Sequence, residues 1–380
     1  MELTNLREEL DQIDSELTQL FIKRMDISAR IAEYKKQNNM PVLDNVRELA
    51  ILNRVANAVG DKLETYARRL FSTLFDLSKS YQNQLMNHSS QLAKDIKAAS
   101  RELTRPFPSK ATVACQGTAG SYSQQACEKL FSMPNPIFLH DFDGVFQAVD
   151  QGLCEYGLLP VENSLAGTIV AVYDLMEKYK FYIARSTRIK INHTLVAKKG
   201  TVLADIREIV SHEQAFSQCS DFIKAHPKVK VTMFSNTAAA ARYVAESNRT
   251  DLAAIAAGSC AELYNLSVVA EDIQNRDSNY TRFICISKDM QIYPGANKIS
   301  IMLTLPHKPG SLCNLLSKFY SLGLNLTKLE SRPIAGRDFE FLFYFDFEGS
   351  VYSKETVSLL SELENSLDKF IFLGSYSEIF

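Results

Sequence analysis

The hydrophobic periodicity of this chain changes near residue 110, and this change limits the fold to several domains of different class. At 380 residues, the chain also exceeds the size at which a single hydrophobic core keeps growing. After residue 110, short β-rich runs alternate with helical runs, which is typical of α/β domains. Before it, apolar residues recur three or four positions apart, which predicts one long amphipathic helix over residues 3–31, with Leu3, Leu6, Leu10, Ile13, Leu17, Leu20, Phe21, Ile27 and Ile31 on its apolar face.

Local signals divide residues 1–92 into three helices. The second helix is expected to begin at Asp44 or Asn45, because Asn45 followed by Glu48 is a capping-box pattern. Gly60 should end that helix. A third helical stretch is then expected from about Leu63 to Leu92, so this first domain should be all-helical.

The remaining chain should form a linker and two further domains. Residues 93–109 lose the periodicity and contain two prolines, which predicts a linker. Over residues 110–287, runs such as TVACQG and PIFLH are each followed by a helical run, and a second series extends from HTLVA to LAAIAA. We expect two α/β lobes with a ligand cleft between them. Residues 297–376 follow a strand–helix–strand–strand–helix–strand order, which is typical of an α+β ferredoxin-like domain.

Charge and composition argue against several classes of function. The 42 Lys and Arg residues are balanced by 44 Asp and Glu residues, so no basic field exists to attract nucleic acid. No apolar run reaches the roughly 18 residues that a membrane-spanning helix needs, and the acidic N-terminus lacks a signal-peptide pattern. The seven cysteines are scattered, with no CxxC pair and no Cys/His cluster. We therefore expect a cytoplasmic protein that needs no metal or other cofactor.

Cations on the first helix could hold a small dianion. Arg24 and Lys35 return to within about 20° of the same helix face, about 16 Å apart along the axis. Arg7 lies about 42 Å from Lys35 along that helix, so only a second chain could bring it to the same site. The alternative is that these are solvated charges on amphipathic helices. Further polar groups share helix faces downstream: Asp44, Arg47 and Glu48, and then Ser80 and Gln84.

This set of residues, with PVLDNVRELAIL at 41–52, resembles the all-helical chorismate mutase domain over residues 1 to about 90. In that family two chains interlock as a helical dimer, and each site takes an arginine from the partner's first helix. The rearrangement of chorismate to prephenate needs a compact conformer and donors where charge develops, not a nucleophile. The resemblance implies that Lys35 and Gln84 act at the ether oxygen, and that the chorismate-binding residues are Arg7, Arg24, Lys35, Asp44, Arg47, Glu48, Ser80 and Gln84.

Five polar motifs in the central region each follow a predicted strand: GTAGSYSQQA at 117–126, PVENSLAGT at 160–168, SHEQAFSQC at 211–219, SNTAAAAR at 235–242 and NYTRFICIS at 279–287. Taken singly, the GTAGSYSQQA turn could be an ordinary strand-to-helix turn, and a lone His212 is more often structural. In PVENSLAGT, however, a helix cap explains only one of the polar groups Glu162, Asn163, Ser164 and Thr168. In this order, the five motifs resemble prephenate dehydratase over residues 111–287. The resemblance implies a two-lobed fold like that of periplasmic binding proteins, with prephenate in the cleft.

Dehydration of prephenate loses water and CO2 and forms an aromatic ring, so it needs a proton for the leaving hydroxyl and an aligned carboxylate. The resemblance implies that Thr281 donates this proton, directly or through water. Glu213 stands where the family often has proline, which affects the turn beside His212. The residues expected to bind prephenate are Ser121, Glu162, Asn163, Ser164, Thr168, His212, Asn236, Thr237, Arg282 and Phe283.

The segments HKPGSLCNLL at 307–316 and LESRPIAGR at 329–337 resemble the ACT regulatory domain that follows prephenate dehydratases. Simple turn and edge-strand chemistry is the alternative. The chain has Ser311 and Cys313 where the commonest motif has Ala and Val. The resemblance implies that phenylalanine binds between paired domains and inhibits the enzyme, with Gly310, Ser311, Leu312, Glu330, Ser331, Arg332 and Pro333 at its site.

These resemblances predict a bifunctional enzyme of phenylalanine biosynthesis, a homodimer through its helical domain, with higher oligomers left open. Its small-molecule partners would be chorismate, prephenate and phenylalanine. A ligand-responsive transcription regulator would need a helix-turn-helix with a basic recognition helix, whereas this chain begins with one long helix. A non-catalytic amino-acid-binding protein would not need the polar positions of the first 90 residues.

Overall fold

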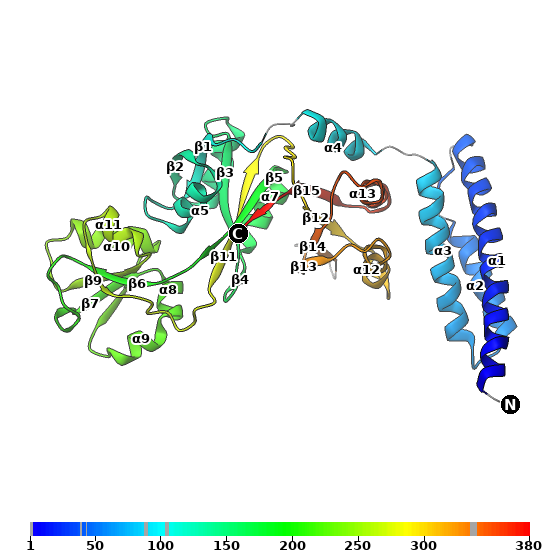
Figure 1. Cartoon of the computed structure of the whole chain (residues 1–380), viewed down its shortest axis with the longest axis horizontal. Helices are drawn as coiled ribbons and strands as arrows, with labels where there is room; N and C mark the ends of the chain where they lie inside the picture. Colours follow the sequence, from blue (N-terminus) through cyan, green and yellow to red (C-terminus); the bar gives the residue numbers. More distant parts are fainter. Residues whose placement is uncertain (1–2, 39, 43, 87–89, 103–105, 335–339) are drawn as a thin grey trace. The chain divides into compact units, whose positions relative to one another are not determined.

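Figure 1 shows a computed structural model of the chain, which describes residues 3–38, 40–42, 44–86, 90–102, 106–334 and 340–380. The contacts divide the chain into two compact units. The first unit contains residues 1–94, 305–323 and 354–368, and the second contains residues 95–304, 324–353 and 369–380. The C-terminal part of the chain therefore contributes helices to the first unit and strands to the second.

The first unit is built of helices. It contains α1 (Leu3–Gln37), α2 (Asn45–Val59), α3 (Glu64–Met86), α12 (Ser311–Ser321) and α13 (Lys354–Ser366). Helices α1 and α2 both pack on α3. The long first helix predicted from the apolar spacing is confirmed, and it extends to Gln37. Within the described ranges, none of the helices has an apolar stretch sufficient to cross a membrane.

Both ends of α2 lie where the sequence places them. The Asp44 carboxylate accepts the backbone N–H of Arg47 at 2.9 Å and so caps the first turn. Gly60 follows the last turn with a φ of 69°, a conformation that glycine adopts without strain. The cap is thus Asp44, one of the two predicted candidates.

The predicted linker is partly helical, because α4 spans Gln91–Glu102. Its apolar side chains Leu92, Ile96 and Ala99 are buried, and their spacing of four and three residues places them on one helix face. The helix is short and has few large apolar residues, so its pattern is weak beside the two prolines that follow.

The second unit begins with a lobe built on a seven-stranded sheet (Figure 1). The strand order is β16-β5-β11-β3-β1-β2, with β4 paired to β3. Helices α5 (Tyr122–Leu130), α6 (Phe142–Asp150) and α7 (Val170–Tyr179) join its strands. The strands are β1 (Lys110–Gln116), β2 (Met133–Leu139), β3 (Tyr156–Asn163), β4 (Gly167–Thr168), β5 (Tyr182–Lys190), β11 (Tyr280–Ser287) and β16 (Glu378–Ile379).

A second lobe follows, and the chain passes between the lobes after β5 and again before β11. Its sheet has the order β10-β6-β9-β7-β8. Its strands are β6 (Thr194–Ala197), β7 (Glu208–Ser211), β8 (Lys230–Met233), β9 (Leu252–Ala256) and β10 (Ser267–Ala270). Its helices are α8 (Glu213–Gln218), α9 (Ser220–Ala225), α10 (Thr237–Glu246) and α11 (Ser259–Leu263), with a short 3-10 turn at Leu203–Asp205. The predicted two-lobed α/β arrangement is thus present.

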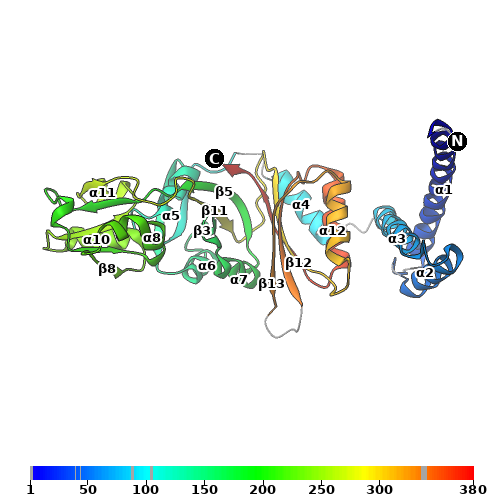
Figure 2. The same ribbon diagram turned by 90° about the horizontal axis from the view of Figure 1, so that it is seen from below.

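A four-stranded antiparallel sheet completes the second unit (Figure 2). Its order is β13-β14-β12-β15, with β12 (Lys298–Thr304), β13 (Leu326–Pro333), β14 (Phe341–Glu348) and β15 (Phe370–Tyr376). Together with α12 and α13, these strands occur along the chain in the predicted order.

This C-terminal sheet shares a hydrophobic core with the first lobe. Leu342 and Tyr344 of β14 belong to the same buried cluster as Val172 and Tyr173 of α7. The tyrosine rings of this pair meet edge to face, with centroids 4.6 Å apart. At Gly374 of β15, an added Cβ would lie 2.4 Å from the carbonyl oxygen of Ile183 on β5, so glycine permits close contact between the two backbones. The first lobe and the C-terminal sheet are therefore packed as one body.

Candidate active sites

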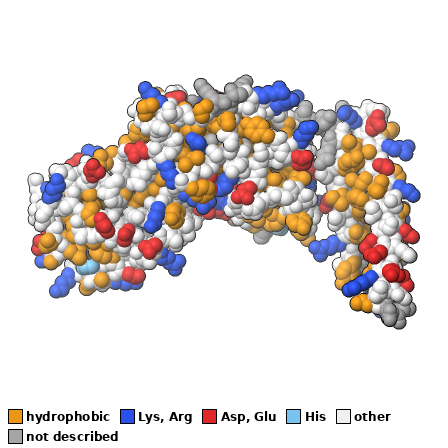
Figure 3. Space-filling view, viewed as in Figure 1, with side chains coloured by type: hydrophobic (Ala, Val, Ile, Leu, Met, Phe, Trp, Pro, Cys, Tyr) orange, Lys and Arg blue, Asp and Glu red, His pale blue; other side chains and the backbone are white. Residues whose placement is uncertain are grey.

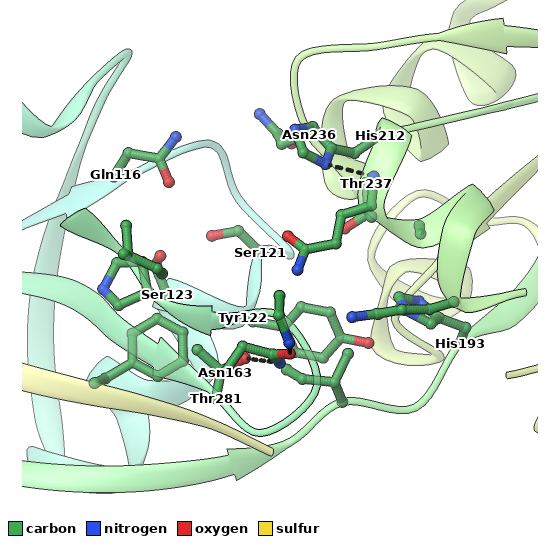
Figure 4. A pocket seen from close by; sticks show the side chains of 18 of the residues that line it. Gln116, Ser121, Tyr122, Ser123, Asn163, His193, His212, Asn236, Thr237 and Thr281 are labelled. Carbon is green, nitrogen blue, oxygen red and sulfur yellow. Dashed lines mark hydrogen bonds between the residues drawn. The ribbon is translucent and has the colours of Figure 1, made fainter. Parts of the chain in front are cut away.

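A cavity of about 420 Å³ lies between the two lobes of the second unit. That volume suits a small organic molecule. Figure 4 shows that polar side chains enter the cavity from both lobes, with Ser121, Asn163 and Thr281 from the first lobe and His212, Asn236 and Thr237 from the second. These six residues and two further predicted prephenate ligands, Thr168 and Phe283, all belong to the lining.

Three of the lining residues cap helices that begin at the cavity. Ser121 caps α5, and its hydroxyl accepts the backbone N–H of Gln124. Asn236 caps α10 through a 2.7 Å bond from the backbone N–H of Ala239. His212 caps α8 through Nδ1, so a neutral ring carries its proton on Nε2, which is then a donor. Helix N-termini bring unpaired N–H groups and a partial positive charge to the site.

The described residues that line the cavity include no lysine and no arginine. An anion in the cavity would therefore meet helix N-termini and neutral donors such as Thr237 and His212. Neutral donors and dipoles can bind a carboxylate without forming a full ion pair.

Asn163 and Thr281 face each other on the neighbouring strands β3 and β11 (Figure 4). Asn163 Oδ1 accepts the backbone N–H groups of Leu165 and Ala166 at 3.0 and 2.9 Å, which establishes which amide atom is oxygen. Asn163 Nδ2 therefore donates to Thr281 Oγ1, at 3.0 Å. This bond uses a lone pair of Thr281, so the proton of its hydroxyl can be donated to a molecule in the cavity.

His193, Gln218 and Asn279 extend this network. Asn279 Oδ1 accepts a bond from Asn163, so Asn279 Nδ2 donates to Gln218 Oε1 at 3.0 Å. That same oxygen must also accept from His193 Nε2, 2.7 Å away, which places the imidazole proton on Nε2. Burial lowers the pKa of His193, although the bond to Gln218 raises it, so the ring is neutral near pH 7.

The sequence did not single out these three residues. His193 and Asn279 lie in the two segments that join the lobes, and Gln218 ends α8. His193 is a single polar residue without a local pattern, and only the tertiary fold brings the three residues together. The one available signal was that Gln218 and Asn279 fall inside predicted motifs.

Two predicted prephenate ligands, Glu162 and Arg282, face away from the cavity and need correction, while a third, Thr168, lines the cavity but is bonded elsewhere. Side chains alternate along a strand, so Glu162 and Arg282 point opposite to their neighbours Asn163 and Thr281. The Arg282 guanidinium is buried against Asp346, at 2.5 Å. Thr168 lines the cavity, but its hydroxyl bonds to the C-terminal sheet, to Lys328 at 2.8 Å and to Glu330.

Ser164 also differs from its predicted role. Its hydroxyl donates to the carbonyl oxygen of Ser278 at 3.0 Å and accepts the backbone N–H of Tyr280 at 2.9 Å. It is not among the residues that line the cavity. Ser164 thus ties the turn after β3 to the start of β11.

In the first unit, two of the predicted cations are held by α3 and by the loop after α1. Arg24 donates to the carbonyl oxygen of Leu74 at 2.9 Å and to Ser78. Lys35 Nζ donates to the carbonyl oxygen of Val42 at 2.7 Å. A guanidinium has five N–H donors and an ammonium three, so both side chains keep donors for an anion.

The other predicted chorismate ligands are distributed over α1, α2 and α3. Glu48 pairs with Lys79 at 3.1 Å, and the Ser80 hydroxyl donates to Glu362 at 3.3 Å. The backbone of Gln84 belongs to α3, but its side chain lies outside the described residues. The remaining ones, Arg7, Asp44 and Arg47, are exposed.

The predicted effector residues of the first C-terminal motif lie where α12 begins. Gly310 precedes α12 with a φ of 87°, which suits glycine. Ser311 and Leu312 form the first turn of that helix. The turn thus has the backbone conformation that its glycine implies.

The second motif is divided between two faces of β13. Glu330 bonds to Thr168, and Arg332 bonds to Asp174 at 2.8 Å, so both side chains contact the first lobe. The expectation that Glu330 and Arg332 bind the effector is corrected accordingly. Ser331 and Pro333 are exposed on the opposite face, and residues 335–337 of the motif lie outside the described residues.

Comparison with protein families finds two matches along the chain. Residues 6–83 match the family model of chorismate mutase type II. Residues 113–291 match the family model of prephenate dehydratase.

Individual relatives cover either the whole chain or its larger part. The bifunctional chorismate mutase/prephenate dehydratase of Buchnera aphidicola subsp. Schizaphis graminum is 31% identical, over 99% of this chain and 96% of its own length. The chloroplastic arogenate dehydratase/prephenate dehydratase 2 of Arabidopsis thaliana is 35% identical, over 70% of this chain and 73% of its own.

Solved structures resemble the larger part of the chain. Prephenate dehydratase from Arthrobacter aurescens, in complex with L-Phe, has a TM-score of 0.63 and 30% identity, covering 70% of this chain and 89% of its own. GqqA, described as a novel type of quorum quenching acylase, has a TM-score of 0.64 and 27% identity, covering 70% and 98%.

Proposed function

The chain belongs to the family of bifunctional chorismate mutase/prephenate dehydratases of phenylalanine biosynthesis, and we propose that its helical N-terminal part and its interlobe cavity are the two active sites. The observation that carries the second assignment is the hydroxyl of Thr281, which Asn163 leaves free to donate a proton into the cavity. The seven cysteines, all free, fit a cytoplasmic enzyme.

In the dehydratase cavity, Thr281 would donate a hydrogen bond or a proton to the ring hydroxyl of prephenate, directly or through water. The C–O bond to that hydroxyl breaks and water leaves. The bond between the ring and its carboxylate also breaks, CO2 leaves, and the electron pair of this bond completes the aromatic ring. The prephenate dianion and one proton thus give phenylpyruvate, CO2 and water. Asn163 positions the Thr281 hydroxyl. Donation from this hydroxyl speeds the reaction only if it acts in the transition state.

The absence of lysine and arginine from the described lining suits this reaction. The ring carboxylate must lose its charge as CO2 forms, so a strong ion pair would stabilise the substrate more than the transition state. The N-termini of α5, α8 and α10, capped by Ser121, His212 and Asn236, would hold the carboxylates less strongly. Thr237 and His212 Nε2 supply further neutral donors.

The mutase site would use cations instead. Arg24, Arg47 and the partner's Arg7 would hold chorismate in its compact conformer, while Lys35 and Gln84 would donate to the ether oxygen as the C–O bond breaks. Asp44, Glu48 and Ser80 would contact the hydroxyl and carboxylate groups.

A homodimer through the helical part is supported by an apolar stripe on α1. Figure 3 shows hydrophobic side chains gathered along the helical N-terminal part. Leu10, Ile13, Leu17 and Leu20 are each more than half exposed. Exposed apolar stripes of this kind mark protein interfaces, and a second copy of α1 has the matching stripe.

Phenylalanine would bind at the C-terminal domain, which we take to be an ACT domain, and would inhibit the enzyme. The proposal rests on two motifs, each taken within its own unit: the turn at Gly310, with Ser311 and Leu312, in the first unit, and Ser331 and Pro333 on the exposed face of β13 in the second. A relative of known structure was solved with L-Phe, which supports this assignment.

Purified protein supplied with chorismate, without metal or nucleotide, tests the assignment. Chorismate should disappear and phenylpyruvate should accumulate, with prephenate as the intermediate, and phenylalanine should slow the process. Loss of chorismate without phenylpyruvate would remove the dehydratase assignment. Supplying arogenate in place of prephenate would show whether the cavity also accepts the amino-acid analogue.

A further inference from the structure

Three paired polar residues form a row across β11, β3 and β4 of the first sheet, and the first two of them point away from the cavity. Arg282 on β11 pairs in register with Glu162 on β3, and Glu162 pairs in register with Thr168 on β4. Directly paired residues project to the same side of a sheet. Each of the first two is the immediate neighbour of a cavity residue, since Glu162 precedes Asn163 and Arg282 follows Thr281.

A second row on the C-terminal sheet matches the first. Asp346 on β14 pairs in register with Lys328 on β13, as Arg282 pairs with Glu162. Arg282 meets Asp346 at 2.5 Å, and Lys328 meets Glu162 at 3.5 Å. Lys328 also donates to the Thr168 hydroxyl at 2.8 Å, while that hydroxyl donates to Glu330. Opposite charges therefore face each other along both rows. We call these six residues the sheet junction: Arg282, Glu162, Thr168, Asp346, Lys328 and Glu330.

Three charged side chains of the sheet junction are buried, which constrains their positions relative to their partners. The side chains of Arg282, Asp346 and Lys328 are only 8%, 6% and 7% exposed. A buried charge that loses its partner is strongly destabilised, so these pairs resist separation. The core shared by Tyr173 and Tyr344 holds the same two layers together. A shift of the C-terminal sheet must therefore move β3, β4 and β11 with it or break ion pairs.

We propose that Asp346, Lys328 and Glu330 of the C-terminal sheet are positioning residues of the dehydratase site, acting through Arg282, Glu162 and Thr168. This inference rests on the proposed dehydratase function of the cavity. The backbone neighbours of the sheet junction, Thr281 and Asn163, are the groups whose placement decides proton donation.

A contact of the same two layers outside the sheet junction provides a matched control. Arg332 of β13 pairs with Asp174 of α7 at 2.8 Å, and the Asp174 side chain is 59% exposed. Arg332 lies on the same strand as Lys328 and projects to the same face. Arg332→Gln removes one ion pair between the layers without touching the row behind the cavity.

The experiment compares Lys328→Met and Asp346→Asn with Arg332→Gln in the full-length chain. Mutase turnover in each preparation measures the amount of active protein. We expect Lys328→Met and Asp346→Asn to lower kcat for prephenate at least about tenfold, since a displacement of about 1 Å can cost a catalytic group about a hundredfold. KM should change less than kcat, Lys328→Arg should restore most of the activity, and Arg332→Gln should stay within about twofold of wild type.

Amide hydrogen exchange separates positioning from general destabilisation. Lys328→Met and Asp346→Asn should speed exchange in residues 160–168 and 280–284, whereas Arg332→Gln should not. Wild-type kcat in both sheet-junction variants, or an equal loss in Arg332→Gln, would overturn the inference. Wild-type protein that rearranges chorismate but leaves prephenate unchanged would instead overturn the proposed dehydratase function.

Discussion

The two proposed sites would hold anionic substrates by different means. The helical site carries Arg7, Arg24, Lys35 and Arg47, whereas the described lining of the interlobe cavity has no cationic side chain. Chorismate keeps both carboxylates during its rearrangement, so fixed cations can hold them throughout. Prephenate must release one carboxylate as CO2, and helix N-termini stabilise that charge without an ion pair. The difference indicates that each site is matched to the charge its substrate keeps or loses.

The largest expected effect is on the neutral donor of the cavity. Thr281→Val keeps the shape of the side chain but removes the hydroxyl, and we expect kcat for prephenate to fall about a thousandfold, within the range of acid–base catalysis. Thr112→Val, on β1 of the same sheet, should leave it unchanged. Steady-state assays with prephenate and with chorismate check this. Near-normal dehydration by Thr281→Val would show that another group supplies the proton.

A smaller effect is expected from removing one cation of the helical site. Lys35→Met should lower mutase kcat by about a hundredfold or more, the usual loss when one donor at a developing charge is removed. Lys36→Met, the adjacent and exposed lysine, is the matched control. Dehydratase kcat should be normal in both variants. If Lys36→Met were as damaging as Lys35→Met, net charge and not a placed donor would explain the loss.

A smaller effect is expected from salt, which should weaken anion binding by cations more than anion binding by neutral donors. Partly exposed charges are screened over about 8 Å at physiological ionic strength. Raising KCl from 0.05 to 0.5 M should therefore raise the mutase KM severalfold and the dehydratase KM less, as measured on one preparation. Equal salt dependence of the two KM values would remove the contrast between the sites.

The smallest expected effect concerns His193 and pH. Burial lowers its pKa below the usual 6.5, so the folded state binds a proton less readily than the unfolded state. The free energy of unfolding should therefore fall as pH drops below 6.5 toward the lower native pKa, by at most about 1.4 kcal/mol per pH unit. Above pH 6.5, His193 should not change the free energy of unfolding. Hydrogen exchange of β11 amides at pH 7.5 and 5.5, corrected for intrinsic rates, measures it. His193→Gln should weaken this dependence, and an unchanged dependence would rule out His193 as its source.

The sequence predicted the helices, and the order of strands and helices along the chain, well where the signal is local. The apolar spacing of α1, the cap at Asp44 and the glycine at Gly60 each depend on a few neighbouring residues. The segment that became α4 was missed because its short apolar face was outweighed by nearby prolines.

The sequence predicted the motifs that contain the site residues, but not which residue of each motif faces the cavity. Glu162–Asn163 and Thr281–Arg282 are adjacent pairs, and strand alternation allows only one member of each to reach the cavity. The pattern does not say which member, since that depends on the C-terminal sheet, which pairs with the other member. His193 was missed because only the tertiary fold brings it to the network.

Mixing two inactive variants tests the separation of the sites most directly. Neither Thr281→Val nor Lys35→Met alone should form phenylpyruvate from chorismate at an appreciable rate. An equimolar mixture should, because one variant releases prephenate that the other dehydrates. If the mixture remained as inactive as its components, although Thr281→Val still rearranges chorismate and Lys35→Met still dehydrates added prephenate, prephenate would not pass freely between independent sites. If either variant lost both activities while folded, the two sites would not be separate.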